Sequence, residues 1–447
     1  MKAKSVLLFL MLVSSSLVYS QISLDVKGKH KKTGKEYSFL YAMRSPGSSE
    51  AMLTARIGDA LGSVGVSWSE LKNIELLPEN AAQFWQAEEM KAGIYAVLLR
   101  KGYQYAQRRA LEEEMAGFLS KVEENGQFYI DSYLESRLYA LLRKVYSVRP
   151  ADGRPGVLSI RIISDIMPDA WVGPDGTLVL STAMLTVVNS EDELMALMAQ
   201  EVAHFVLDHH IDNYNSLVAT YGQADLAQTI KYSREQEFQA DQCAVGLLKL
   251  LGKDPLALSS VLKKVRSYGE TMGNYHIVSG TGLFPYAAMR EATIGLAGTF
   301  FSGDYEKMIA PVLTHNAYKA YNLSQYLLCQ NLLDRNIVSG QATGNDYVLM
   351  SEALLRLYDT PEKNEEALMM VREAVSLGGP SVAAAYKQEV LVLLRMGLNE
   401  EAGKALDRCA SALEQEFNRY SAMPGDWSQT LSYLSTEISW VGRMRRR

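Results

Sequence analysis

Cysteine is scarce in this chain of 447 residues, which contains only three. Cys243, Cys329 and Cys409 lie far apart in the sequence, so they cannot form the disulfide framework of a small extracellular domain. Two interpretations remain open: a bond between Cys329 and Cys409, or burial of all three as small apolar side chains, which we favour. The sequence therefore predicts folding around apolar cores rather than around covalent links.

Long apolar runs are also missing after the first twenty residues. No later stretch reaches the roughly 18 consecutive apolar residues that a membrane-spanning helix needs, so we expect no integral membrane span. Residues 1–20 combine Lys2 and Lys4 with an apolar run over 6–13 and small residues before Ser20. This pattern is typical of a cleaved signal peptide. We therefore expect an exported protein, either periplasmic or secreted.

The sequence also lacks an excess of positive charge. The chain has 45 Lys and Arg residues against 51 Asp and Glu residues, a formal net charge of −6 at pH 7. Removal of Lys2 and Lys4 with the signal would change this charge from −6 to −8. A surface of this sign repels a phosphate backbone, so we expect no nucleic acid partner.

The chain is too long for one ordinary hydrophobic core, and its residue patterns change along its length. We expect four regions: a signal peptide at 1–20, an N-terminal region at 21–125, a central domain at 126–298 and a helical domain at 299–447. The N-terminal region begins with a hairpin within residues 23–43, around the turn at 32–35. From Pro78 onward, apolar residues at helical spacing predict long helices.

The central region mixes helix and strand patterns. A helix is predicted over residues 129–145, and strands are predicted over 157–163 and 177–180. More helices follow, so the order of elements is helix, strands and then helices again. This order is typical of an α+β fold.

Two capping boxes mark helix starts in the central region. Ser190 is followed three residues later by Glu193, and Ser233 is followed in the same way by Gln236. We expect the first of these helices to run to about His209. The second carries carboxylates on one face.

Helical patterns fill the chain after about residue 300. The tetrapeptide at 364–367 recurs at 399–402, an offset of 35 residues, and Ala374 then falls opposite Cys409. A period of about 34 residues with paired helices is typical of tetratricopeptide repeats, although an ordinary helical bundle would also fit two such units. We expect an all-α tetratricopeptide-like domain whose concave face binds a partner segment.

The helix that begins after Ser190 carries the most informative motif. Residues 200–204 read Q-E-V-A-H, which is the zinc-binding sequence H-E-x-x-H with its first histidine replaced by Gln200. In the intact motif two histidines share one helix face and bind zinc, while the glutamate acts as general base. Glu201 and His204 are retained here.

Several segments accompany this motif in a fixed order and spacing. They are 169–171 with 176–181, 190–210, 233–241 with 251–255, and 284–290. Together they resemble the zinc metallopeptidases of the CAAX prenyl protease and HtpX type, over about residues 126–298. The helical tail is similar to that of periplasmic members that survey outer-membrane proteins. The resemblance implies a gluzincin-like metallopeptidase domain.

The resemblance also implies roles for residues at matching positions. The family's metal ligands fall on Gln200, His204 and Glu237, and its general base falls on Glu201. Asp241 matches a carboxylate that orients a ligand imidazole.

A further family feature is a His-Pro pair near the site, with an arginine six residues after the histidine. Pro285 and Arg290 are present at these positions, but Phe284 replaces the histidine. We therefore expect Arg290 beside the site. Two histidines of the family pattern are absent from this chain.

The strand before the motif helix borders the substrate cleft in this family, and substrate lies along it as an added strand. In this chain the matching strand is 177–181. The resemblance thus implies that Leu178, Val179 and Leu180 bind an extended polypeptide substrate.

The replacement at position 200 changes what the site can bind. Imidazole suits zinc well, whereas a neutral amide oxygen is a poor zinc ligand. His204 and Glu237 leave two good protein ligands, while a catalytic zinc usually has three and a water. The expected cofactor is zinc if the site is functional, and none otherwise.

Two expectations concern the residues around the motif. The amide nitrogen of Gln200 can donate a hydrogen bond to Asp241 on the second motif helix. His209 lies five residues after His204, a step that turns it about 140° away on a helix. We therefore expect His209 and His210 to be surface or packing residues, and recruitment of either as a substitute metal ligand is the alternative.

These observations support three hypotheses about function. In the first, the protein is an exported metallopeptidase homologue that binds extended or unfolded envelope proteins without efficient cleavage. In the second, it is an active zinc metalloendopeptidase with an altered ligand set and Glu201 as general base. In the third, the helical tail alone binds a partner and the peptidase-like domain is a platform. Each makes a polypeptide the partner, in proteolysis or in protein quality control.

Overall fold

The computed structural model of the chain describes residues 25–44, 51–57, 60–62, 70–92, 103–146, 158–273, 286–379 and 382–446. They belong to two compact units, one combining 1–270 with 274–300 and the other combining 271–273 with 301–447. The expected signal peptide, Phe284 and Pro285 lie outside the described residues. Along the described stretches, no helix has the length and apolarity needed to cross a membrane.

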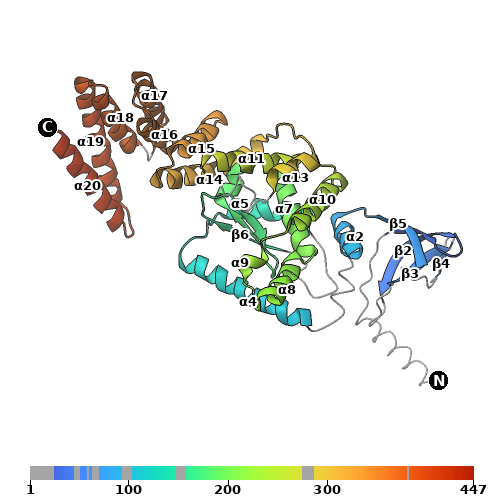
Figure 1. Ribbon diagram of the computed structural model, residues 1–447. Helices are drawn as coiled ribbons and strands as arrows, with labels where there is room; N and C mark the ends of the chain where they lie inside the picture. Colours follow the sequence, from blue (N-terminus) through green and yellow to red (C-terminus); the bar gives the residue numbers. More distant parts are fainter. Residues whose placement is uncertain are drawn as a thin grey trace, which may run out of the picture. The chain divides into compact units, whose positions relative to one another are not determined.

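A five-stranded antiparallel sheet begins the first unit, with strand order β4-β3-β2-β1-β5 (Figure 1). The strands are β1 Asp25–His30, β2 Glu36–Arg44, β3 Ala51–Ile57, β4 Ala60–Gly62 and β5 Leu71–Leu77. The expected hairpin is confirmed, because β1 and β2 pair around a turn in which Gly34 has a φ of 70°. The sequence does not predict β3, β4 or β5. In β5, Asn73 has left-handed backbone and Leu71 alone is buried, so the strand shows little apolar alternation.

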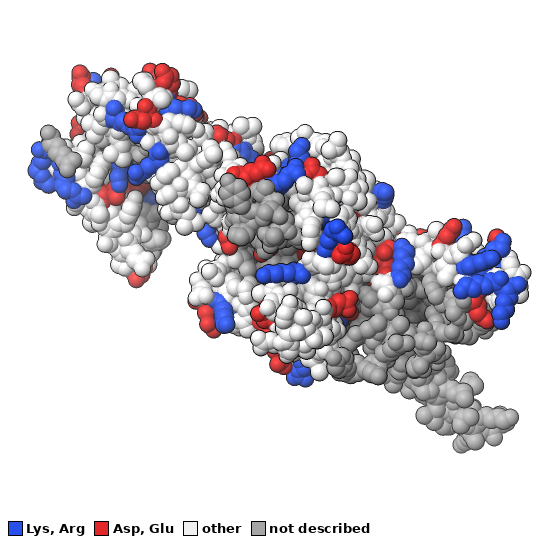
Figure 2. Space-filling view, in the orientation of Figure 1, with Lys and Arg blue, Asp and Glu red and all other residues white. Residues whose placement is uncertain are grey.

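Basic side chains gather over this sheet (Figure 2). Lys29 lies across from Lys72 in the β1–β5 pair, and its ammonium group is 3.5 Å from Glu36 on the other neighbouring strand. Both partners of that ion pair are well exposed, so it contributes little stability. We interpret this surface as a solvated face.

Two helices follow the sheet, as the pattern after Pro78 predicts. They are α2 Ala81–Ala92 and α4 Tyr103–Glu124. The buried indole of Trp85 in α2 donates a hydrogen bond of 2.8 Å to the carbonyl of Val145. This bond ties α2 to the end of α5 Ser132–Val145, which confirms the helix expected over 129–145.

A three-stranded sheet lies at the centre of the first unit. It has the order β6-β8-β7, with β6 Ser159–Ile163, β7 Ala170–Val172 and β8 Thr177–Ser181. β6 and β8 confirm the two expected strands and are parallel, with Ile160 opposite Leu178. β7 is antiparallel to β8 and is not predicted, because three residues are too few to show a period.

The expected role of 177–181 as a sheet edge is wrong. β8 is hydrogen-bonded to β6 on one side and to β7 on the other. Leu178, Val179 and Leu180 are at most 2% exposed. The backbone of β8 is already paired, so an added peptide strand cannot pair with it.

Helices cover the central sheet. α4 packs on it through Met115 and Phe118, which contact a cluster that includes Trp171 and Val179. The rings of Phe118 and Trp171 lie 5.6 Å apart. α5 contacts β6, and α7 Glu191–Val206 contacts both α5 and β7. The motif helix is therefore held directly on the sheet.

The motif helix ends earlier than expected. α7 stops at Val206, and a new helix, α8 His209–Tyr221, begins after Asp208. Asp208 has left-handed backbone, with φ 55°, which few residues other than glycine, asparagine and aspartate adopt. Its carboxylate pairs with Arg108 of α4 at 2.6 Å. This ion pair holds the break that the sequence pattern does not reveal.

Ser190 marks the start of α7 as expected, but the reciprocal hydrogen bond of the capping box, from the Ser190 amide to the Glu193 side chain, is replaced by another. Ser190 accepts a hydrogen bond from the backbone of Glu193, whereas the Glu193 carboxylate accepts from the backbone of Asn189. The same carboxylate binds Ser260 and Lys264 of α11 Ala257–Thr271. The capping box of Ser233 and Gln236 is complete, as expected.

The remaining helices of the first unit complete the surroundings of the motif. They are α6 Thr182–Val187, α9 Leu226–Thr229, α10 Arg234–Leu250 and α13 Ala287–Ile294. α10 packs on both α7 and α13.

The described part of the second unit is all helical, so the whole chain has a mixed α+β fold with a C-terminal all-helical region. Its helices are α14 Gly303–Asn322, α15 Tyr326–Val338, α16 Gly344–Leu357, α17 Pro361–Leu377, α18 Val382–Arg395, α19 Asn399–Ala422 and α20 Ser428–Met444. Each packs on the next in the chain, and α16 also packs on α18.

The offset of 35 residues connects equivalent positions of α17 and α19. Ala367 and Ala402 are both buried, and so are Ala374 and Cys409. Cys243, Cys329 and Cys409 are all free and buried, which confirms burial over a disulfide bond.

Glu193→Ala should lower the free energy of unfolding by roughly 3 kcal/mol, because it leaves Lys264, Ser260 and the amide of Asn189 without their shared acceptor. Asp192→Ala is the matched control, because Asp192 forms a more exposed pair with Lys253 and its loss should cost less than about 1 kcal/mol. Urea unfolding followed by tryptophan fluorescence measures both. Equal losses would show that Glu193 is no more than a helix cap.

Candidate functional site

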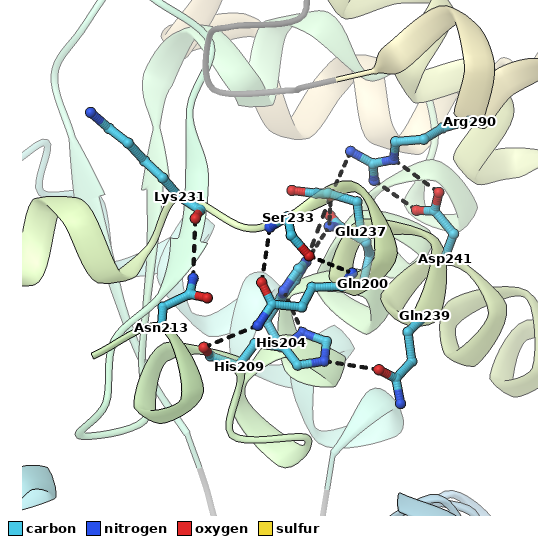
Figure 3. A network of polar contacts seen from close by, with 11 residues as sticks. Gln200, His204, His209, Asn213, Lys231, Ser233, Glu237, Gln239, Asp241 and Arg290 are labelled. Atoms are coloured by element: carbon cyan, nitrogen blue, oxygen red, sulfur yellow. Dashed lines mark hydrogen bonds and ion pairs between the residues drawn. The ribbon is translucent and has the colours of Figure 1, made fainter. Parts of the chain in front are cut away.

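Three helices bring the expected site residues together. α7 supplies Gln200 and His204, α10 supplies Glu237 and Asp241, and α13 supplies Arg290 (Figure 3). Glu201 is the sixth and also lies on α7. All six are at most 4% exposed. The complete capping box at Ser233 fixes the start of α10, so Glu237 and Asp241, one turn apart, share the face that meets α7. The spatial cluster expected from the sequence is present.

Arg290 holds the two carboxylates of α10. Its Nη1 lies 2.7 Å from Glu237 Oε2, and its Nη2 and Nε lie 2.7 and 2.9 Å from the two oxygens of Asp241. Burial alone would lower the pKa of Arg290, but Glu237 and Asp241 outweigh it and raise that pKa above its usual range. The guanidinium is therefore a permanent positive charge inside the site.

Gln200 joins this arrangement through its amide nitrogen. Gln200 Nε2 donates to Glu237 Oε2 at 3.3 Å and lies 2.9 Å from His204 Nε2. The expected bond from Gln200 to Asp241 is wrong, because Arg290 binds both oxygens of that carboxylate. Gln200 Oε1 is buried and accepts no hydrogen bond from the described residues.

His209 is a buried packing residue, one of the expected alternatives, but the expectation that it turns away from His204 is wrong. Because α7 ends at Val206, the angle calculated for a continuous helix does not apply, and His209 Nδ1 lies 3.0 Å from His204 Nδ1. His209 Nε2 lies 3.3 Å from Gln239 Oε1, which can only accept a hydrogen bond. In the neutral form, His209 thus donates from Nε2 and accepts at Nδ1.

The donor and acceptor of each hydrogen bond in this network then follow. His204 donates from Nδ1 to His209, so His204 Nε2 carries a lone pair and accepts from the amide nitrogen of Gln200. Burial lowers the pKa of both histidines, that of His209 to about 3, and each is further lowered by a nearby basic group. Each ring nitrogen of the two neutral imidazoles therefore has a hydrogen-bond partner within the chain.

Tyr232 covers His204 and is the site residue that sequence reasoning missed. The two rings stack 3.6 Å apart at an angle of 17°, and the Tyr232 hydroxyl oxygen is buried with no hydrogen-bond partner in the described chain. Tyr232 directly precedes the N-cap Ser233. Its contact with His204 joins residues 28 positions apart in the sequence, so no local pattern indicates it.

Two further carboxyl groups lie in the electrostatic environment of the site. Burial raises the pKa of Glu201 well above its ordinary value, and Glu237 raises it further. Burial also raises the pKa of Asp169, next to β7, to about 7. Both carboxyl groups therefore hold a proton more tightly than they would in water.

These donors do not fit a zinc ion. His204 directs its Nε2 lone pair at the Gln200 amide, and Glu237 is neutralised by Arg290. A cation bound by Glu237 would meet the guanidinium at close range, and the remaining nearby donor is an amide, a poor zinc ligand. Over the described residues, no three His, Cys, Asp or Glu side chains are grouped to hold a metal.

Residues 140–227 match the model of peptidase family M48. The match includes the central sheet and all of α7, and it ends before α10, so Glu237, Asp241 and Arg290 lie beyond it. It supports an M48 metallopeptidase-like domain in a family of zinc metallopeptidases that act on polypeptides. No curated protein matches the chain.

Arg290→Ala should lower the free energy of unfolding by about 3–5 kcal/mol, because Glu237 and Asp241 would be left buried with no countercharge. Arg266→Ala is the control, since Arg266 forms a partly exposed pair with Glu291 and should cost less than about 1 kcal/mol. Chemical denaturation of both variants provides the comparison. A loss below about 1 kcal/mol for Arg290→Ala would contradict the central role of this arginine.

Asp169→Asn should make stability less dependent on pH. Because the folded-state pKa of Asp169 is raised to about 7, the native state holds its proton more tightly, and stability falls as pH rises through that pKa. Between pH 5 and 8 the unmutated protein should lose roughly 2 kcal/mol more than Asp169→Asn. Glu123 is exposed, so Glu123→Gln is the control and should show the same dependence of stability on pH as the unmutated protein. If Asp169→Asn also shows that dependence, Asp169 does not cause it.

Proposed function

We propose that the protein is an exported, non-hydrolytic homologue of zinc metalloendopeptidases that binds extended or unfolded polypeptides. The observation that carries this proposal is the position of the Gln200 amide. Its nitrogen lies 2.9 Å from Nε2 of His204 and donates to Glu237, so it occupies the lone pairs of the two residues that the resemblance makes metal ligands. The match to peptidase family M48 supports the metallopeptidase-like part of this proposal.

Hydrolysis of a peptide bond by this fold class requires a bound metal, and the ligand set for that metal is altered here. Gln200 replaces a good zinc ligand with an amide that already binds His204 and Glu237. Tyr232 stacks on the ring of His204 and supports the orientation in which Nε2 faces that amide.

We place polypeptide binding on the helical domain, which we interpret as a tetratricopeptide-like repeat. The central sheet supports this choice by exclusion, because β8 is paired on both sides and cannot accept a peptide strand. The short edge strand β7 is at most 8% exposed, so its backbone has little free surface. In the helical domain, by contrast, large side chains such as Tyr318, Leu391 and Tyr433 are between 39% and 59% exposed.

Metal analysis tests this proposal directly. The full chain, incubated with zinc and then desalted, should retain far less than one zinc per chain by mass spectrometry. Gln200→His should raise that content, because it adds an imidazole beside His204, although Arg290 still competes for Glu237. Gln415→His, on the exposed surface of α19, is the control and should leave the content unchanged.

Stoichiometric zinc in the unmutated chain would overturn the non-hydrolytic assignment. A second measurement follows cleavage of a carboxymethylated, permanently unfolded protein. If the unmutated chain cleaves it and Glu201→Gln abolishes cleavage, the protein is an active metalloendopeptidase. If no cleavage occurs and the unfolded protein binds, the proposal is supported.

A further inference from the structure

A partly enclosed cavity of about 280 Å³ lies within the helical domain. Its walls come from α14, α16, α18, α19 and α20, so helices far apart in the sequence meet around it. This volume is smaller than a typical drug-sized ligand site and suits one long side chain. The cavity is separate from the cluster around Arg290, which belongs to the other unit.

One basic group lines this cavity, and its charge is already neutralised. Lys387 Nζ lies 2.6 Å from Glu437 Oε2 and 5.2 Å from the centre of the Trp440 ring. Glu437 is largely buried. An anionic ligand would therefore have to compete with a carboxylate already in place.

Negative charge exceeds positive charge around the cavity. Glu416 also lines it, and Arg419, one turn later on α19, partly offsets its charge. Tyr433 lines the cavity as well: burial raises its pKa, and Glu437, Glu416 and Glu352 raise that pKa further, opposed by Lys387. The cavity is therefore a region of negative potential.

Exposed aromatic rings complete the site. Tyr318 and Tyr433 are 39% and 59% exposed and line the cavity, while Leu413 and Leu434 add apolar wall. Tyrosine faces attract cations, and carboxylates pair with them. An apolar stem ending in a positive charge matches both the walls and the potential, and lysine and arginine side chains have this form.

We propose that this cavity takes the cationic side chain, lysine or arginine, of a bound polypeptide. The proposal rests on the proposed polypeptide-binding function and adds a preference in side-chain chemistry. The head group would lie by Glu416 and the tyrosine rings, while its methylene groups contact Leu413 and Leu434. Lys387 stays paired with Glu437 and keeps that side of the cavity neutral.

The test uses the full chain and short, blocked Gly-Ser-Ala peptides with one variable central residue. Peptides containing arginine, lysine, citrulline, norleucine and glutamate are titrated by ligand-observed NMR. The arginine and lysine peptides should bind at least about fivefold more tightly than their neutral counterparts, the effect of one partly screened ion pair. Glu416→Gln should remove most of this difference.

Glu414→Gln is the matched control, because Glu414 lies on the same helix, is exposed and does not line the cavity. It makes the same change in charge and should preserve the preference. Equal loss in the two variants would mean that overall charge, rather than the cavity, selects the peptide, and the inference would fail.

The remaining outcomes separate this inference from the proposed function. Equal binding of cationic and neutral peptides, or strongest binding of the glutamate peptide, overturns the inference while leaving polypeptide binding intact. If the carboxymethylated unfolded protein binds but no peptide is preferred, the inference also fails and polypeptide binding stands. If neither the unfolded protein nor any peptide binds, the proposed function itself fails.

Discussion

The contact of Arg290 with Glu237 and Asp241 is the interaction on which the rest of the site depends. It joins α13 to α10, and through the Gln200 amide it continues to α7. Each of these groups would be costly to bury alone, and together they form one neutralised, hydrogen-bonded cluster. The three helices around the motif are thus held together by contacts that the chain itself supplies.

The break in the helix after Val206 supplies a hydrogen-bond partner for the other ring nitrogen of His204. If α7 continued, His209 would point away, and His204 Nδ1 would need another acceptor. Left-handed Asp208, held by Arg108, instead turns the chain so that His209 supplies that acceptor. The hydrogen bonds are then consistent: Gln200 donates to both Glu237 and His204, and His204 donates to His209. The local backbone irregularity therefore determines which tautomers the site contains.

Patterns that depend on neighbouring residues could be predicted from the sequence, and those that depend on distant contacts could not. The starts of α7 and α10 and the strands β6 and β8 followed from capping residues and periodicity. The spatial cluster of Gln200, His204 and Glu237 followed from the family resemblance. β7 is too short to show a period, and the end of α7 depends on Arg108, far away in the chain. The predicted hydrogen bond from Gln200 to Asp241 was wrong because Arg290 binds both oxygens of that carboxylate. Helix geometry alone does not reveal this contact.

The internal ion pair at Glu237 also bears on how the protein is made. Glu237 and Asp241 are buried on α10, whereas their countercharge lies on α13, and Arg290 follows Asp241 by 49 residues. While the chain is being synthesised, the two carboxylates therefore lack this partner until α13 has emerged. Burial of α10 against α7 before that point would leave two uncompensated charges, so we expect this contact to form late in folding.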